Sequence, residues 1–301
     1  MMALIYMLKK FLLSLFCVLY AFNSHGKDIK IITTIKPIES LIANIIDDTD
    51  TVSAMIDGNY SHHNFALKPS QIRKIYQSDA VILINPNFET FMRSSYKIIP
   101  HNTAIITLSD TPDMSFLEIA KNNQHTKHNV TDFHIWLSPD NAIQIVKYLT
   151  KKLSTLNPDK QAIYQENSKH MIAKLSALHK QLLVKTEPIK HKSFMAFHNA
   201  YQYFIKAYDL NYAGAITHNP MAYTSVKKIK RAQKKLADNN VHCVFKEPQF
   251  SDTMIETIIQ ENRTKIGILD PLGGNSPAGK AHYFQLMHAI GDNLQECLGN
   301  N

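Results

Sequence analysis

Residues 157–187 read NPDKQAIYQENSKHMIAKLSALHKQLLVKTE, and this stretch decides the fold. Asn157 is a good N-cap and Pro158 a good first helical residue, and nearly all the residues that follow are helix formers. An apolar stripe at helical spacing predicts a helix of about 28 residues, which would be about 42 Å long. That length exceeds one small domain, so we expect a rigid strut that joins two lobes. The stripe comprises Ile163, Met171, Ile172, Leu175, Leu178, Leu182 and Leu183.

Short apolar runs alternate with helical patterns on both sides of this stretch, which is typical of parallel sheets built from βαβ units. The predicted fold class is therefore α/β, with two pseudo-symmetric lobes whose mainly parallel sheets are flanked by helices. We expect an N-terminal lobe at 27–156, the linker helix at 157–187 and a C-terminal lobe at 188–301. Strands are predicted at Ile29–Thr34, Val81–Ile84, Ala104–Leu108, Ser193–Phe197, Cys243–Phe245 and Ile266–Leu269, and helices or amphipathic segments at Ile38–Ile46, Pro69–Gln77, Ala200–Ala207, Val226–Ala237, Met254–Gln260 and Ala278–Cys297.

The composition excludes several classes of protein and draws attention to histidine. The chain has 301 residues, of which 45% are hydrophobic, so it can bury real cores and is not generally disordered. Nine glycines and the lack of a repeat exclude fibrous and low-complexity classes. Fifteen histidines are an unusual number for this length. Because histidine is the commonest metal ligand, their positions are the first functional question.

The first 26 residues have the pattern of a secretory signal peptide. The pair Lys9-Lys10 precedes the apolar run 11–22, which is too short to cross a bilayer of about 30 Å as a helix. Small residues favour cleavage after Gly26, with residues 23 and 24 as alternatives, and a buried N-terminal helix is the other interpretation. Cys17 lacks the preceding small residue that lipoprotein processing needs, so we expect a soluble product.

Removal of this segment leaves two cysteines, Cys243 and Cys297, and a net charge of +6. In an oxidising compartment two cysteines are expected to pair, and the loop of about 54 residues would contribute about 4 kcal/mol. Two separate free thiols are the alternative. The lysines of Val226–Ala237 fall at helical spacing beside apolar residues, which is typical of a solvated helix face. The basic balance therefore does not indicate nucleic-acid binding.

Four segments carry potential metal ligands that follow a predicted strand or lead into a helix. They contain His62 and His63 before LKPS, His134 in FHIWLSP, His198 in AFHNAY, and Asp270 in LDPLG. The carboxyl ends of strands border the ligand crevice in open α/β sheets, so this arrangement suits one shared site. Two of the segments lie on each side of the long helix.

The chain resembles the metal-binding proteins of bacterial ABC importers that carry zinc or manganese. The motifs that carry the resemblance are, in order, HHNFALKPSQIRKI, DAVILINPNFETFM, HIWLSPDNA, FMAFHNAYQYF, CVFKEPQF and ILDPLGGN. The similarity extends from IITTIKPIESLIANI to the last cysteine. It implies a metal held in the cleft between the two lobes, and the pair Cys243 and Cys297 resembles the disulfide of that family.

The resemblance implies a ligand set of His63, His134 and His198, with Asp270 at a carboxylate position that is a ligand in some members and lies near the metal in others. Three imidazoles and one oxygen suit tetrahedral Zn²⁺ at about 2.0 to 2.2 Å. Manganese carriers of the family usually have a carboxylate where this chain has His198. We therefore expect zinc as the transported ion.

Two departures from the family pattern affect the expected site. Zinc-type members often have a glutamate before the first histidine, where this chain has His62 as a possible further nitrogen donor. They also carry a long histidine-rich loop before the second ligand, of which only His125 and His128 remain here. With Asp132 nearby, these two residues form either a second weak metal site or a solvated loop. Glu247, in KEPQF, is expected to support the site rather than to bind the metal.

The expected function is capture of Zn²⁺ in the periplasm of a Gram-negative bacterium and its delivery to an ABC-type permease in the inner membrane. We expect a monomer that is not an enzyme and does not bind nucleic acid, and whose zinc affinity falls below about pH 6 as imidazoles protonate. The alternatives are a manganese carrier of the same family and a secreted zinc hydrolase. The sequence lacks HExxH, and Glu247 is the only candidate general base for the hydrolase. A host-binding adhesin is a third, minor alternative.

Overall fold

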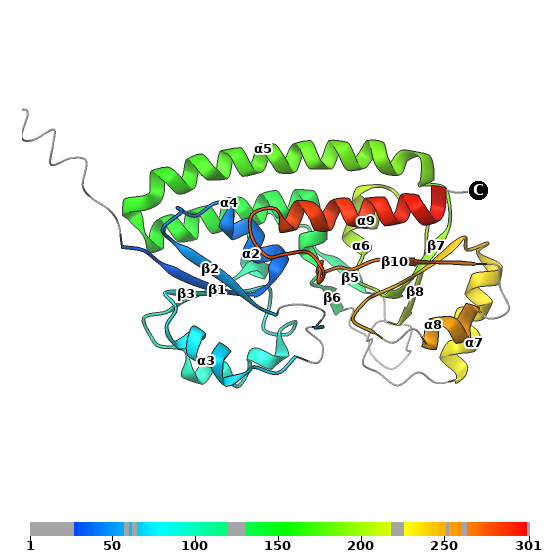
Figure 1. Cartoon of the computed structure of the whole chain (residues 1–301), viewed down its shortest axis with the longest axis horizontal. Helices are drawn as coiled ribbons and strands as arrows, with labels where there is room; N and C mark the ends of the chain where they lie inside the picture. Colours follow the sequence, from blue (N-terminus) through cyan, green and yellow to red (C-terminus); the bar gives the residue numbers. More distant parts are fainter. Residues whose placement is uncertain are drawn as a thin grey trace, which may run out of the picture.

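The computed structural model describes residues 27–56, 60–61, 65–119, 130–217, 226–250, 253–259 and 264–299. The predicted signal peptide and the predicted ligands His62, His63, His125 and His128 lie outside these residues. Two sheets lie side by side along the long axis of the molecule, and long helices cover them on one side (Figure 1).

The N-terminal sheet is entirely parallel and has the order β2-β1-β3-β4. Its central strands are buried, in keeping with their near-continuous apolar sequences. The first helix begins directly after β1, with Pro37 in its first turn, and it buries seven of its eight residues. The elements are β1 (Lys30–Ile35), α2 (Lys36–Ala43), β2 (Thr51–Ile56), α3 (Pro69–Tyr76), β3 (Ala80–Leu83) and β4 (Ala104–Thr107).

The C-terminal sheet repeats this topology. Its order is β10-β9-β7-β8, and all its strands are again parallel. Read from β8, this order places the lobe's second strand first, followed by its first, third and fourth strands, as in the N-terminal sheet. The predicted pseudo-symmetric lobes are confirmed. The elements are β7 (Phe194–His198), α6 (Gln202–Ala207), β8 (Tyr212–Thr217), α7 (Val226–Asp238), β9 (Cys243–Lys246), α8 (Thr253–Ile259), β10 (Lys265–Ile268) and α9 (His282–Gly299).

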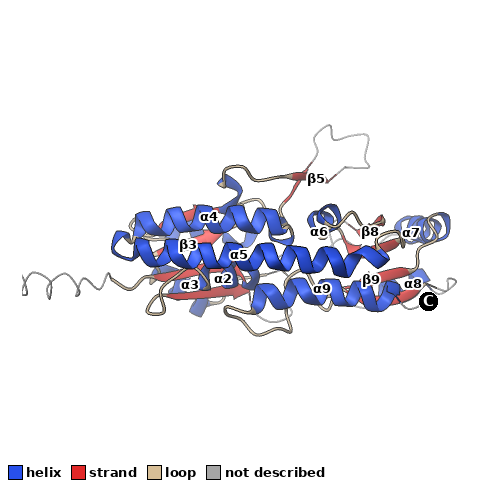
Figure 2. Ribbon diagram, turned by 90° about the horizontal axis from the view of Figure 1, so that it is seen from above, coloured by secondary structure: helices blue, strands red, loops and turns tan. Residues whose placement is uncertain are grey.

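Three long helices form a layer over the sheets. Helix α4 (Pro139–Leu156) covers the N-terminal lobe, α9 covers the C-terminal lobe, and α5 (Gln161–Thr186) runs across both, as the view from above shows (Figure 2). Ser138 begins α4 by accepting a hydrogen bond from the backbone N–H of Asn141. The predicted strut is therefore present, with 26 residues in its α-helical part.

Details of the strut differ from the prediction. The side chain of Asn157 does not cap the helix but donates to the carbonyl oxygen of Lys27 at 2.7 Å, and a 3₁₀ turn precedes α5. Ile163 and Leu183 are 44% and 42% exposed. Helix α5 therefore buries only one side of the predicted apolar stripe. The buried members of the stripe are Met171, Leu175, Leu178 and Leu182.

The first turn of the strut is fixed to the N-terminal lobe by a buried amine. The Nζ of Lys160 lies 2.7 Å from an oxygen of Asp50, 3.0 Å from an oxygen of Asp28 and 2.6 Å from the hydroxyl of Thr49. Tyr164 donates its hydroxyl to the other oxygen of Asp50 at 2.6 Å. Although burial lowers it, hydrogen bonds to Asp50 and Asp28 raise the pKa of Lys160 above its ordinary value. The amine therefore stays charged, and its positive charge balances the negative charges of Asp50 and Asp28.

The segment before α9 crosses from the C-terminal lobe onto the N-terminal lobe. The amine of Lys36 donates to the carbonyl oxygens of Gly274 and Ser276 at 3.0 and 3.1 Å. The hydroxyl of Ser40 donates to the carbonyl oxygen of Lys280 at 3.1 Å. The indole N–H of Trp136 donates to the carbonyl oxygen of Pro271 at 2.8 Å. The two lobes are thus joined by hydrogen bonds as well as by the strut.

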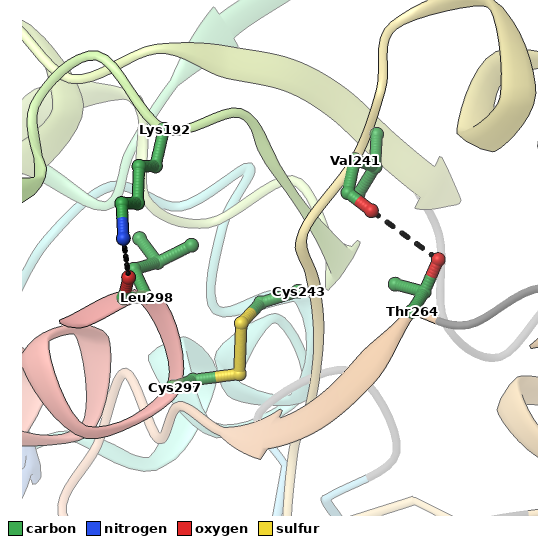
Figure 3. The surroundings of a disulfide bond; sticks show 6 residues. All are labelled: Lys192, Val241, Cys243, Thr264, Cys297 and Leu298. Carbon is green, nitrogen blue, oxygen red and sulfur yellow. Dashed lines mark hydrogen bonds between the residues drawn. A yellow bond between two sulfur atoms is a disulfide. The ribbon is translucent and has the colours of Figure 1, made fainter. Parts of the chain in front are cut away.

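A disulfide joins Cys243 on β9 to Cys297 on α9, as predicted (Figure 3). Beside it, Lys192 donates to the carbonyl oxygen of Leu298 at 2.7 Å. The end of α9 is therefore held against the C-terminal sheet. Since α9 belongs to the long-helix layer, the disulfide ties the C-terminal sheet to that layer.

Several elements were not predicted from the sequence. They are the edge strands β2 and β8, an antiparallel hairpin of β5 (Leu117–Ile119) and β6 (Val130–Asp132), and the short 3₁₀ helices. No helix among the described residues is long and apolar enough to cross a membrane. The 3₁₀ helices are η2 (Thr90–Met92), η3 (Ser95–Ile98), η4 (Leu108–Asp110), η5 (Ile135–Leu137), η6 (Pro158–Lys160) and η7 (Glu187–Ile189).

Candidate metal centre

His134 lies in the turn between β6 and η5, and a buried aspartate fixes its ring. An oxygen of Asp132 accepts both the backbone N–H of His134, at 3.0 Å, and a hydrogen bond from its Nδ1, at 2.7 Å. The other oxygen accepts from Gln202 at 3.0 Å. A carboxylate on Nδ1 selects the tautomer with its proton there, so the lone pair is on Nε2. This is the form of histidine that binds a metal through Nε2.

Aromatic rings of the N-terminal lobe pack around His134. The ring of Phe88 meets the imidazole edge-on, with centroids 5.4 Å apart, and the ring of Trp136 lies 5.3 Å away. Both His134 and Trp136 are buried. The imidazole is therefore held in a dry environment, where its rotamer is restricted by packing.

His198 ends β7 and comes from the other lobe. In the parallel pair of β7 and β9, Ala196 is opposite Phe245. Two residues further along the chain are His198, the last residue of β7, and Glu247, the residue after β9. The Nδ1 of His198 lies 3.5 Å from an oxygen of Glu247. Both side chains are almost fully buried. Glu247 therefore lies on the Nδ1 edge of the ring.

The two imidazoles are close enough to share one ion. Their ring centroids are 5.1 Å apart and their planes are inclined by 74°. Two imidazoles bound through nitrogen to one tetrahedral zinc, with Zn–N distances of about 2.0–2.1 Å, have centroids about 5 Å apart. The distance between His134 and His198 therefore matches a shared tetrahedral ion.

Asp270 follows β10 and organises the loop after it. One of its oxygens accepts from the backbone N–H of Leu272 at 2.9 Å and from Gln249 at 2.8 Å, and the other accepts from the backbone N–H of Gly274 at 2.6 Å. Gly273 between them has a φ of +64°, and an added Cβ would lie 3.0 Å from the ring of His282. Both oxygens of Asp270 thus have protein donors. Within the described residues, no three His, Cys, Asp or Glu side chains meet as a metal-binding group.

His282 supports the same loop from behind. Its Nε2 lies 2.9 Å from the carbonyl oxygen of Leu272 and its Nδ1 lies 3.1 Å from that of Pro277. Burial keeps the pKa of His282 below its ordinary value. This histidine is therefore a structural partner of the loop that carries Asp270.

The structure also contains supporting residues that sequence reasoning did not identify as such. Asp132 was considered only with the loop that carries His125 and His128, whereas its side chain contacts His134. Tyr203, on α6, donates its hydroxyl to the carbonyl oxygen of Asp132 at 2.6 Å. The signal for Asp132 is its position two residues before His134, at the end of a strand.

Tyr201, the residue before α6, is fully buried near two acidic residues. Burial, with the charges of Glu247 and Asp270, raises the pKa of Tyr201 well above its ordinary value. Its hydroxyl therefore stays protonated, as a neutral polar group within the influence of both carboxylates.

Comparison with known proteins identifies relatives along almost the whole chain. The chain is 27% identical over 288 residues to the high-affinity zinc uptake system protein ZnuA of Haemophilus ducreyi, covering 89% of this chain and 93% of that protein. It is 26% identical over 304 residues to the protein of the same name from Brucella abortus, covering 89% and 91%. The ZnuA of Buchnera aphidicola is 27% identical over 306 residues, covering 96% of both chains.

Solved structures agree with these relatives. A crystal structure of ZnuA superimposes with a TM-score of 0.79 at 26% identity, covering 90% of this chain and all of that one. A ZnuA deletion mutant with zinc bound gives a TM-score of 0.78 at 25% identity, covering 91% and 100%. The periplasmic zinc-binding protein TroA of Treponema pallidum shares the fold, with a TM-score of 0.79 at 16% identity.

A family model described as zinc-uptake complex component A, periplasmic, matches residues 31–297. This range includes both lobes, the strut, and the segments that carry His134 and His198. The chain therefore belongs to the ZnuA family.

Proposed function

We propose that this chain captures Zn²⁺ in the periplasm and delivers it to an ABC-type permease for zinc uptake. The observation that carries the proposal is the pair of buried imidazoles, one from each lobe, whose centroids are 5.1 Å apart. A carboxylate lies on the Nδ1 side of each ring. This arrangement presents two oriented nitrogen donors to one ion, which is what a protein that binds a metal without catalysing a reaction requires.

We propose His63 as the third ligand and Asp270 as a nearby carboxylate of the site. Imidazole donors suit zinc better than manganese, which prefers oxygen ligands. The relatives named as high-affinity zinc uptake proteins support the same ion. Both oxygens of Asp270 accept hydrogen bonds from the protein. Asp270 would therefore support the metal through its negative charge and by fixing the loop, and direct binding to the metal would require the loss of one of these hydrogen bonds.

We also propose that residues 1–26 are a cleaved signal peptide, that the mature chain is a periplasmic monomer, and that its partner is an inner-membrane permease. The family description as periplasmic supports the location. The Cys243–Cys297 disulfide supports it independently, since disulfides persist in oxidising compartments. A carrier of this kind needs no catalytic group.

The position of Glu247 argues against the hydrolase alternative. A general base must reach the water on the metal. Glu247 lies on the Nδ1 edge of His198, whereas a metal shared with His134 would lie on the Nε2 edge. The carboxylate is therefore better placed to orient the imidazole than to activate a water.

Competition titration of the metal-free chain with a chromogenic zinc chelator tests the proposal. His134→Ala and His198→Ala are each expected to lower zinc affinity by more than the 10–100-fold typical of losing a supporting group. His170→Ala, which removes an exposed imidazole from α5, is the matched control and should bind as wild type. Unchanged zinc affinity in His198→Ala, or manganese binding equal to zinc binding, would overturn the assignment.

The same titration separates the remaining candidates. His63→Ala should abolish tight binding, and His62→Ala should weaken it only modestly. Esterase, phosphatase and peptidase assays of the zinc-loaded chain should show no turnover. Turnover that is lost in His198→Ala would favour the hydrolase over the carrier.

A further inference from the structure

The positive charge of the chain is concentrated on one helix. Helix α7 carries six basic residues and one acidic residue, a net charge of +5 out of +8 for the whole chain. Lys9 and Lys10, in the predicted signal peptide, account for two more charges. All other residues together therefore have a net charge of only +1.

The packing of α7 turns these charges to solvent. Ala232 and Leu236 are buried in a small core that also contains Ile255 and Ile258 of α8. The opposite side of α7 exposes Lys227, Lys230, Arg231 and Lys234. Lys234 pairs with the exposed Asp238 at 2.8 Å, a contact that contributes little in water. A basic face is thus fixed on a folded scaffold.

The other lobe carries a second basic helix on the same side of the molecule. Arg73 and Lys74 of α3 and its N-cap residue Lys68 are exposed, and residues 65–78 contain no Asp or Glu. In Figure 1, α3 and α7 both lie on the side of the sheets opposite the long-helix layer. Both lobes therefore carry an exposed basic helix on this side of the molecule.

Exposed aromatic residues accompany the charges near α3. Tyr76 is 66% exposed and Tyr60 is 56% exposed, and the Nζ of Lys68 lies 5.7 Å from the ring centroid of Tyr60. Tyrosine beside lysine and arginine is the combination found where proteins meet the headgroup region of a bilayer. We define this basic face as the exposed residues Lys68, Arg73, Lys74, Tyr76, Lys227, Lys230, Arg231 and Lys234.

We propose that the basic face binds the anionic phospholipid headgroups of the membrane that contains the permease. This inference rests on the proposed carrier function, since it gives the membrane as the destination. Lysine predominates in the face, and lysine is a strongly hydrated point charge that is depleted in protein–protein interfaces. A diffuse layer of phosphates fits such a surface better than a specific protein partner does.

The expected consequence is a shorter search for the permease. A chain held loosely at a charged surface explores two dimensions instead of three, and its weak electrostatic binding remains reversible and sensitive to salt. Release of zinc is not required for this step. Zinc binding and lipid binding are therefore separable in experiment.

Flotation of the zinc-loaded chain, residues 27–301, with lipid vesicles tests the proposal. The wild type should bind vesicles with 30% phosphatidylglycerol at low salt, and should not bind pure phosphatidylcholine vesicles or either type at 0.5 M NaCl. Each basic residue near an anionic surface adds about fivefold to binding. The variant Lys227→Gln/Lys230→Gln/Arg231→Gln/Lys234→Gln should therefore bind roughly 600-fold more weakly.

A matched variant on the opposite face controls for net charge. Lys147→Gln/Lys151→Gln/Lys174→Gln/Lys180→Gln removes four exposed positive charges from α4 and α5 and should retain vesicle binding. All three proteins should bind zinc equally, so a loss of vesicle binding is not a loss of the site. The proposal is overturned if the wild type ignores anionic vesicles, if both variants lose binding equally, or if binding appears only when the vesicles contain the permease.

Discussion

A buried carboxyl group in the N-terminal lobe predicts how stability depends on pH. Glu89 is fully buried at the carboxyl ends of β1 and β3. One of its oxygens accepts from the hydroxyl of Thr34 at 2.6 Å and from the backbone N–H of Ile84 at 2.9 Å, and the other accepts from that of Asn85 at 2.9 Å. Burial outweighs these hydrogen bonds and raises the pKa of Glu89 from 4.5 to about 7.

The sign and size of the effect follow from proton linkage. Between pH 4.5 and 7 the folded chain keeps a proton on Glu89 that the unfolded chain has released. The contribution of this group to stability is therefore complete below about pH 4.5 and is lost as the pH rises through 7. The difference between the two pKa values corresponds to about 3 kcal/mol of unfolding free energy.

Urea unfolding of the wild type and of Glu89→Gln, measured from pH 4.5 to 8.5, isolates this contribution. Glutamine cannot ionise, so the variant should gain about 3 kcal/mol relative to the wild type across the range, while other titrations cancel in the difference. Glu166→Gln, which changes an exposed carboxylate, should show no such trend. A constant difference, or a wild type that gains stability with rising pH, would refute the reasoning.

Three other perturbations test other parts of the structure. Cys243→Ser/Cys297→Ser should lower the unfolding free energy by about 4 kcal/mol, because it frees a loop of 54 residues; dithiothreitol should have the same effect on the wild type in urea unfolding. Lys160→Met leaves the buried Asp50 without its ammonium partner and should cost about 3–5 kcal/mol by the same measurement, more than Lys160→Arg. Asp132→Asn should lower zinc affinity about 10–100-fold in the chelator titration while thermal unfolding of the metal-free chain changes little; unaltered affinity would remove Asp132 from the site.

The strongly periodic parts of the fold could be predicted, and the parts set by distant contacts could not. Helix α5 has a sustained apolar stripe, and β3 is a continuous apolar run, so both were found. The edge strands β2 and β8 are mostly half-exposed and have no alternating pattern. Asn157 has the residue type of a cap, but its amide donates to Lys27, 130 residues earlier, and no local signal shows this.

Some residues of the candidate site could likewise be predicted from the sequence, and others could not. The histidines that meet, His134 and His198, are carried by motifs and follow strands, so their positions could be predicted. Their carboxylate partners depend on the register of β7 against β9 and on the turn after β6. Glu247 becomes the neighbour of His198 only when Ala196 is opposite Phe245, and that pairing is a property of the sheet.

The hydrogen bonds between the crossing segment before α9 and the N-terminal lobe determine how rarely the two lobes separate. Lys36 and Ser40 on α2, and Asn44 at its C-cap, donate to carbonyl groups of residues 274–280, and Trp136 donates to Pro271. With about 1 kcal/mol for each bond, parting the lobes along this line costs about 5 kcal/mol. A form with separated lobes would then be a minor state of about one molecule in several thousand, and an ion that bound only through that form would lose apparent affinity by the same factor.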